Sequence, residues 1–185
     1  MISVKKLSKS IKIILFGVGL SIPTYAQNLS SKTVKVRFFS STPIEDIKAV
    51  SEKGVAVLVA KTGEIAFQIP IKSFEFARGL MQEHFNENYM ESNKYPYAKF
   101  SGKLNQPVDL TKDGEYSVVA AGLLSMHGIS KQRSIPGKIK VVNGNVQLSS
   151  SFDVACVDHN IKIPKLVITK VAEVVKVDID ATLKP

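Results

Sequence analysis

The side chains of this sequence that could do chemistry are three histidines and one cysteine. His84, His127 and His159 fall on three separate segments, and Cys156 is the only cysteine. A metal site needs several such ligands close together, and none of the histidines belongs to a ligand motif such as HExxH. We therefore expect no metal site.

Two pairs of residues could combine a nucleophile with a base, Ser125 with His127 and Cys156 with His159. Residues two apart on a strand share a face. Catalysis also needs an orienting carboxylate and an oxyanion site, and no GxSxG turn supplies them. The glycines are isolated, so no phosphate-binding loop is predicted. We expect no catalytic residues and no cofactor, and we interpret His127 and His159 as hydrogen-bonded structural residues.

The one long helical pattern lies in the middle of the chain. Met81, Phe85 and Tyr89 recur at a spacing of four, which predicts an amphipathic helix over about 78–90 with an aromatic stripe. The helix ends in polar ESNK, and strict alternation then predicts a half-buried strand over 98–104. The aromatic stripe needs an apolar partner, either as core or as the wall of a pocket.

Much of the remaining chain alternates between apolar and polar residues, which is typical of half-buried strands. One run is long: at about 3.3 Å per residue it would extend about 40 Å, roughly twice a typical strand. Asn143-Gly144 predicts a tight hairpin. The predicted strands cover about 34–38, 55–60, 65–71, 98–104, 116–127 (the long run), 135–141, 146–154 and 171–183.

Two local features complete the secondary structure. Thr42-Pro43-Ile44-Glu45 combines an N-cap threonine, a proline at the first helical position and a glutamate three residues after the cap. This pattern predicts a short helix over about 43–50. The polar residues 27–32 are expected to be loose, without regular secondary structure.

Eight antiparallel strands with one apolar face each can pack as a sandwich or close into a barrel, and periodicity does not separate the two. The long strands favour a barrel. An eight-stranded barrel is either just filled by its side chains or wide enough for one ligand. Small residues on the inner face, such as Ala98, Ala120, Gly122 and Ser150, favour the second. The sequence thus predicts an all-β fold, an eight-stranded antiparallel barrel with two helices.

The first 26 residues have the pattern of a secretory signal peptide. Four lysines precede an apolar run over 13–22, and small residues follow up to Ala26. We expect cleavage after Ala26 and a single domain over 27–185. Loss of the four lysines lowers the formal charge from +9 to +5. The remaining lysines are spread singly, which does not indicate a nucleic-acid surface. Cys156 alternates with apolar residues and is expected to be a buried thiol.

Five segments carry a family resemblance through their order and spacing. They are Phe74-Glu75-Phe76, NENYMES over 86–92, KYPYAKFSG over 94–102, GLLSMHGISK over 122–131 and FDVACVDHNIKIP over 152–164. Together they resemble the YceI-like family of exported bacterial lipid-binding proteins, over nearly the whole chain after residue 26. The resemblance implies an elongated, lipocalin-like barrel that holds a long polyisoprenoid or quinone-like molecule, a periplasmic location and no established catalysis.

The expected ligand is thus one long apolar molecule, sequestered or carried inside the barrel. Each buried CH₂ of its tail would contribute about 0.8 kcal/mol, so no strong head-group contact is required. Two alternatives stay open: a structural or interaction barrel filled by side chains, and an enzyme acting on a lipid or quinone with His127 or His159 as base. Two further partners are considered: a second copy of the chain, in a homodimer, and a membrane surface, in transient contact.

The residues that we assign to ligand binding lie on the inner face of the barrel and on the helix over 78–90, which we call the helical lid. They are Phe67, Ile69, Met81, Phe85, Tyr89, Phe100, Tyr116, Val118, Met126, Phe152 and Val154.

Overall fold

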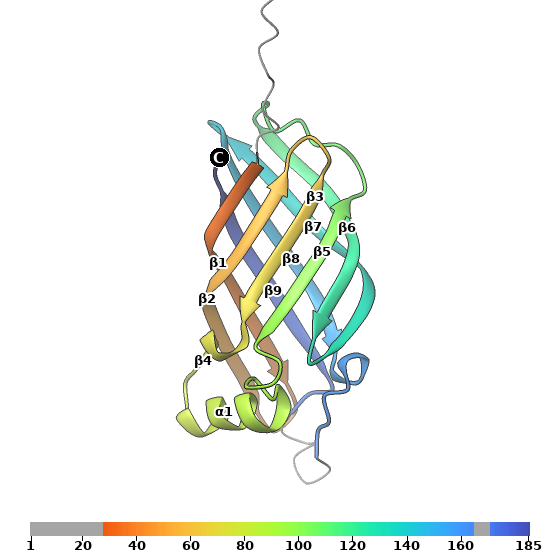
Figure 1. Ribbon diagram of the computed structural model, residues 1–185. Coiled ribbons are helices and arrows are strands. Elements are labelled where there is room, and N and C mark those ends of the chain that lie inside the picture. The colour runs from red at the N-terminus through yellow and green to blue at the C-terminus, as the bar shows by residue number, and fades with distance from the viewer. Residues whose placement is uncertain (1–27, 165–170) are drawn as a thin grey trace, which may run out of the picture.

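The computed structural model describes residues 28–164 and 171–185, which form a closed antiparallel barrel (Figure 1). Residues 1–26, expected to be a signal peptide, lie outside the described part. Eight long strands pair in the order β1-β9-β8-β7-β6-β5-β3-β2, and β1 also pairs with β2, which closes the ring. The all-β prediction of an eight-stranded antiparallel barrel is confirmed.

The described strands and helical turns follow one another in a simple up-and-down order. They are β1 (Asn28–Ser41), β2 (Asp46–Val59), β3 (Glu64–Pro70), the 3₁₀ turn η1 (Ile71–Ser73), β4 (Glu75–Phe76), α1 (Gly79–His84), the π-helical turn η2 (Phe85–Tyr89), β5 (Tyr97–Leu104), β6 (Gly114–Met126), β7 (Ile129–Val142), β8 (Asn145–Ala155), the 3₁₀ turn η3 (Cys156–His159) and β9 (Val174–Leu183).

The two ends of the barrel differ (Figure 1). One end, the helical end, carries α1, η2, η3 and the turns that join β1 to β2 and β6 to β7. The other, the hairpin end, carries the turns that join β2 to β3 and β7 to β8, together with the C-terminus. The two-residue strand β4 pairs with β2 at Ala49 and Val50, and thereby connects the helical lid to the wall.

Branched aliphatic side chains fill the hairpin end. Leu58, Ile139 and Leu183 are fully buried, and Val141 and Val146 are only 1 % exposed. All five lie close to the β2–β3 turn, the β7–β8 turn or the C-terminus. This part of the barrel therefore has the packing of an ordinary protein core.

The helix expected over 78–90 is present as α1 and η2, over 79–89. In an α-helix of 3.6 residues per turn, each step of four residues overshoots a full turn by about 40°. The chain changes to a π turn at Phe85, where the Met90 amide donates to the Phe85 carbonyl at 2.9 Å. Since a π turn has more residues per turn, it reduces this overshoot. Met81, Phe85 and Tyr89 consequently all reach the barrel interior.

The prediction of a short helix over 43–50 is wrong. The Thr42 hydroxyl does accept a hydrogen bond from the Glu45 amide at 3.0 Å, as an N-cap would, but the Thr42 amide also donates to the Glu45 carbonyl at 3.1 Å. The capping contact thus closes a hairpin turn, and β2 begins at Asp46. Pairing of β2 with β1 on one side and with β4 on the other outweighs the local helix signal.

Residues 27–32 were expected to be loose, but β1 begins at Asn28. Residues 28–31 pair with residues 56–59 of β2. Leu29 and Ser31 are buried on the inner face of this strand. Tertiary pairing therefore orders a segment whose polar composition indicates no structure by itself.

Two glycines let β5 and β6 approach closely. Gly102 and Gly122 are register partners, and both stand where inward-facing side chains would be. A Cβ atom at Gly122 would lie 2.2 Å from the Ser101 carbonyl oxygen, and one at Gly102 would lie 2.6 Å from the Ala121 carbonyl oxygen. Glycine is required here because of this close backbone approach, which is typical of a bend in a barrel wall.

We expect Gly122→Ala to destabilise the protein, because the added methyl group overlaps a backbone atom that cannot rotate away. Overpacking of this kind costs about 3 kcal/mol, equivalent to a fall in Tm on the order of 10 °C for a domain of this size. Thermal unfolding followed by circular dichroism measures the effect.

Gly79→Ala is the matched control. Its Cβ would meet no atom within 4 Å, and it lies at the start of α1, where alanine favours the helix. An unchanged Tm for Gly122→Ala would contradict the close approach of β5 and β6.

Candidate functional site: an apolar cavity in the helical half of the barrel

The interior of the barrel holds a cavity of about 330 Å³. It begins below the filled hairpin end, at Ile65, Leu104 and Val118, and runs to the helical end. There it reaches the surface beside the exposed His84 and the half-buried Glu45. We call this opening the mouth.

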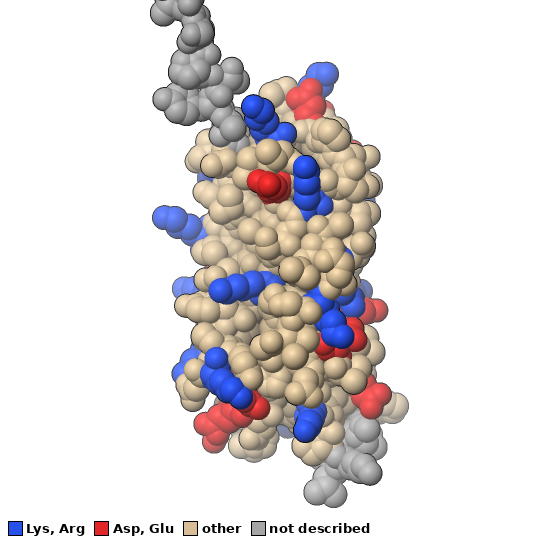
Figure 2. Space-filling model, turned by 45° about the vertical axis from the view of Figure 1, so that its right-hand side comes forward, with Lys and Arg blue, Asp and Glu red and all other residues tan. Residues whose placement is uncertain are grey.

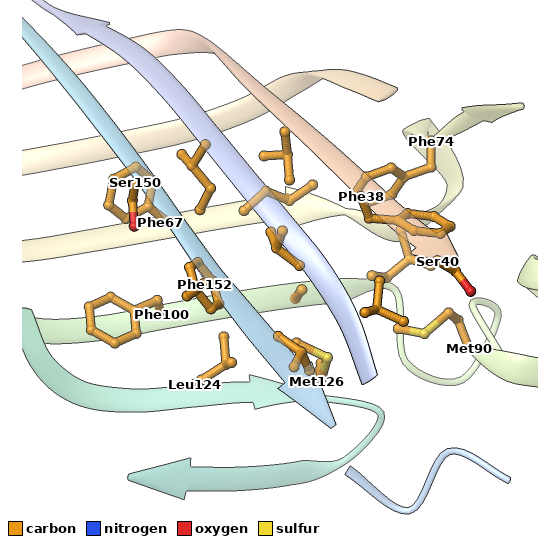
Figure 3. Close-up of a pocket in the computed structure, with 18 of the residues that line it drawn as sticks. Phe38, Ser40, Phe67, Phe74, Met90, Phe100, Leu124, Met126, Ser150 and Phe152 are labelled. Atoms are coloured by element: carbon orange, nitrogen blue, oxygen red, sulfur yellow. The ribbon is translucent and has the colours of Figure 1, made fainter. Parts of the chain in front are cut away.

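Side chains from every strand of the barrel line the cavity. Phe67, Phe100, Leu124 and Phe152 project into it from four different strands (Figure 3). Alternation explains this arrangement, since every second residue of a strand faces the interior. Aromatic and aliphatic side chains dominate the wall, which suits it to apolar molecules.

Ten of the eleven residues that the sequence assigned to ligand binding line this cavity. From the strands they are Phe67, Ile69, Phe100, Val118, Met126, Phe152 and Val154, and from the helical lid Met81, Phe85 and Tyr89. Tyr116 does not line it. Its half-buried ring packs on the core of the hairpin end, and its hydroxyl donates to the Lys112 carbonyl at 3.1 Å.

Other lining residues were not assigned from the sequence. Some follow the same alternation as the assigned ones, and applying it to every strand would have found them: Val36, Phe38, Leu124, Ile135, Leu148, Val175, Val177 and Ile179. Ile161, Ile163 and Val171 lie outside strands and turn toward the cavity only because of tertiary structure. Val171 shares the alternation of Val175 and Val177 although β9 begins only at Val174, whereas Ile161 and Ile163 fall in no predicted strand.

Four phenylalanines hold the helical lid on the barrel. Phe85 of η2 stacks on Phe38 of β1 with ring centroids 5.5 Å apart. Phe85 also contacts Phe74 at 5.7 Å and Phe76 at 5.0 Å. Such pairs contribute about 0.5–1.5 kcal/mol each beyond burial of their area. One ring thus joins the lid to three other segments.

Few polar groups line the cavity, and at the mouth the Glu45 carboxylate, which pairs with Arg78, is accompanied by neutral groups. Burial raises the pKa of the Tyr89 phenol and the pKa of the Cys156 thiol, so both stay protonated at neutral pH. Ser40 is 2 % exposed, and its hydroxyl accepts a hydrogen bond from the Ala172 amide at 2.9 Å. The mouth therefore offers hydrogen-bond donors to an uncharged oxygen atom of a ligand.

The two histidines interpreted as structural do make backbone contacts. His159 is 1 % exposed, and its Nδ1 donates to the Ile129 carbonyl at 3.2 Å. His127 Nδ1 lies 3.0 Å from the His159 carbonyl, to which it donates. Together they fasten η3 to the β6–β7 turn, and burial lowers the pKa of His159.

Neither nucleophile–base pair considered from the sequence is formed. Ser125 Oγ lies 2.7 Å from Ser130 Oγ, whereas the neighbouring His127 Nδ1 is directed at the His159 carbonyl. The Cys156 thiol is directed at the Ala172 carbonyl, 3.9 Å away, and His159 Nδ1 at Ile129. The described geometry therefore supports binding more directly than catalysis.

Within 28–164 and 171–185, no group of three His, Cys, Asp or Glu side chains is close enough to hold a metal ion. In the same ranges, no helix is long and apolar enough to cross a bilayer. On the face in Figure 2, Lys and Arg are scattered and interspersed with Asp and Glu.

A closed antiparallel barrel with an apolar cavity that reaches the surface at one end defines a small-molecule-binding barrel of the lipocalin type. A family model described as the YceI-like domain matches residues 21–183. The chain belongs to this family. None of the curated proteins compared with the chain matches it.

Solved structures share the fold at low sequence identity. A polyisoprenoid-binding domain from Saccharophagus degradans, implicated in plant cell wall breakdown, is 15 % identical with a TM-score of 0.72, covering 86 % of this chain and 98 % of that one. BcnA from Burkholderia cenocepacia is 14 % identical with a TM-score of 0.69, covering 82 % and 96 %. The YCEI protein of Campylobacter jejuni is 12 % identical with a TM-score of 0.54, covering 98 % and 94 %.

The buried His159 predicts a specific pH dependence of stability. Its pKa is lower in the folded protein than the usual value of about 6.5 in the unfolded chain. Above pH of about 6.5 both states are neutral at this residue, and its contribution is fully present. As the pH falls toward the folded pKa, the unfolded chain binds the proton more readily, and the free energy of unfolding drops by up to about 1.4 kcal/mol per pH unit.

Urea unfolding between pH 5 and 8 measures this loss. In His159→Asn the part of the pH dependence that comes from this residue should disappear. His84→Asn, which changes an exposed histidine of α1, should keep the wild-type profile. A wild-type slope in His159→Asn would show that other groups cause the acid sensitivity.

Proposed function

We propose that this protein is exported and carries one long apolar molecule of the polyisoprenoid or quinone class inside its barrel. The observation that supports this most strongly is the cavity of about 330 Å³, which apolar side chains line from mid-barrel to the mouth. Pockets for small molecules have volumes of about 300–1,000 Å³. A cavity of this size also counts against the alternative of a barrel filled throughout by side chains.

The chemistry of the wall favours a chain-like ligand. Burial of an apolar tail contributes about 0.8 kcal/mol per CH₂. The side chains that line the deep part of the cavity, such as Phe67, Phe100 and Phe152, are uncharged and apolar and so suit such a tail. The tail therefore enters first and lies along the barrel axis. The name of the Saccharophagus degradans relative describes that protein as polyisoprenoid-binding, which supports the same class of ligand here.

The head group then lies at the mouth, beside Ser40, Tyr89 and Cys156. Protonated phenol and thiol groups donate hydrogen bonds, so a carbonyl or hydroxyl oxygen fits this position. A quinone or a polyprenol has such an oxygen. The function thus depends on shielding the tail, with the head group held by a few neutral donors.

Export to the periplasm is the second part of the proposal. It is supported by the lysines, the apolar run and the small residues of positions 1–26. In that location the protein would shield its ligand from water during storage or transit between membranes.

The proposal is tested by closing the cavity. Ala120 lines it, whereas the next residue, Ala121, is exposed on the outer face of β6. A phenylalanine in Ala120→Phe should displace about three CH₂ groups of the tail. This corresponds to about 2.4 kcal/mol, or roughly fiftyfold weaker binding. Ala121→Phe should bind like the wild type.

Native mass spectrometry after addition of a polyprenol, or of a quinone of similar tail length, measures the bound fraction. A second pair, Leu124→Glu and Leu123→Glu, places one charge in the cavity and the same charge on the outer face. Thermal unfolding shows which variants are folded. If the folded cavity variants bind as well as their controls, or if the wild type binds neither lipid, the proposed ligand site is wrong.

A further inference from the structure

The four most exposed large apolar side chains of the described residues all lie at the helical end. Ile44 is 64 % exposed, Leu80 63 %, Val157 81 % and Val174 51 %. They come from four segments: the β1–β2 turn, α1, η3 and the start of β9. We call these four residues the apolar rim.

Each rim residue is the direct neighbour in sequence of a residue that lines the cavity. These pairs are Ile44 with Glu45, Leu80 with Met81, Val157 with Cys156, and Val174 with Val175. At three of the four segments a lining side chain, Met81, Cys156 or Val175, thus stands next to a side chain that is exposed to solvent, and at the fourth Ile44 stands next to Glu45 at the mouth. The rim therefore lies at the end of the barrel where the cavity reaches the surface.

Direct contacts connect the segments of the rim. An ion pair between Arg78 and Glu45 joins the start of α1 to the β1–β2 turn. The Ala172 amide donates to Ser40 Oγ at 2.9 Å, and the Cys156 amide donates to the Glu173 carbonyl at 2.8 Å. These bonds connect β1, η3 and the segment before β9. The rim is consequently a defined part of the folded barrel.

We propose that the apolar rim docks the mouth on the surface of a lipid bilayer, so that the cavity opens directly toward the acyl region. This inference rests on the proposed function. A tail held in the cavity and a tail in a bilayer are both shielded from water, and each CH₂ that crosses an aqueous gap loses about 0.8 kcal/mol of that shielding. A rim in contact with the bilayer removes the gap.

The size of the rim favours a bilayer over a protein partner. A specific protein interface buries about 800 Å² on each side, and four aliphatic side chains on separate segments present only a small part of this area. Shallow insertion into the interfacial region needs a few such side chains. Since Arg78 at the rim is paired with Glu45, binding is expected on zwitterionic phosphatidylcholine as well as on anionic lipid.

The chain has no tryptophan, which allows single tryptophans to report on the contact. Leu80→Trp and Val157→Trp label the rim, and Leu123→Trp and Val57→Trp label exposed positions of the barrel wall. The chain from Gln27 onward is used, because the apolar run over 13–22 would bind vesicles itself. The chain from Gln27 onward contains every residue that the structure describes.

We expect phosphatidylcholine vesicles to shift the emission of the two rim tryptophans to shorter wavelength and to leave the wall tryptophans unchanged. In a sedimentation assay with the same vesicles, Leu80→Ser and Val157→Ser should each bind roughly tenfold more weakly than the wild type, whereas Leu123→Ser should bind equally well. Circular dichroism confirms that each variant is folded.

Three results would overturn the docking proposal: no shift at the rim, an equal shift at the wall, or a rim shift that follows protein concentration without vesicles. The last would show two copies associating through their rims. Because this test uses ligand-free protein, it is independent of ligand uptake. Docking without polyprenol or quinone binding would refute the proposed function alone, and ligand binding without docking would refute this inference alone.

Discussion

The continuous ring of backbone hydrogen bonds is the constraint on which the rest of the structure depends. Each of the eight long strands pairs with a neighbour on both sides, and β1 closes the ring against β2. The main-chain polar groups of the wall are thereby satisfied without help from the interior. The interior can then be apolar, and part of it can stay unfilled. Closure of this ring also depends on the close approach of Gly102 and Gly122, because it lets the wall bend.

Stability and binding are separated along the barrel axis. Leu58, Ile139 and Leu183 form a packed core at the hairpin end, where nothing needs to enter. At the helical end the contacts are of another kind: an aromatic cluster centred on Phe85, a hydrogen bond that His159 donates to the Ile129 carbonyl, and one that Ser40 Oγ accepts from the Ala172 amide. They fix the lid and the turns at their edges and leave the axis of the barrel free. A single strand such as β6 serves both purposes, since Val118 lies near the core and Met126 lies near the mouth.

Alternation predicted the strands and much of the cavity wall, because in a closed barrel the period of two decides which side chains face inward, whereas strand length and small inner residues favoured a barrel over a sandwich. Phe67, Phe100 and Phe152 follow this rule. The errors arose where local and tertiary signals compete. Thr42 makes the contact of a helix cap, but strand pairing turns that contact into a hairpin. Tyr116 faces inward as predicted, but it lies near the hairpin end, where side chains fill the barrel. Alternation shows which face a side chain is on and carries no information on its position along the barrel axis. Ile161 lies in no strand, so alternation did not assign it to the cavity wall.

Among the residues that the structure describes, the packed core closes the cavity at the hairpin end, and the cavity opens at the helical end. A molecule that enters through the mouth must leave through the mouth, tail last. Under the proposed function, the protein could therefore not pass a lipid through its length from one partner to another. Under the proposed function and docking, transfer of a lipid between two membranes would require the protein to detach from the first, turn its helical end round and present it to the second. The reorientation of the whole molecule in water then becomes a step of transport.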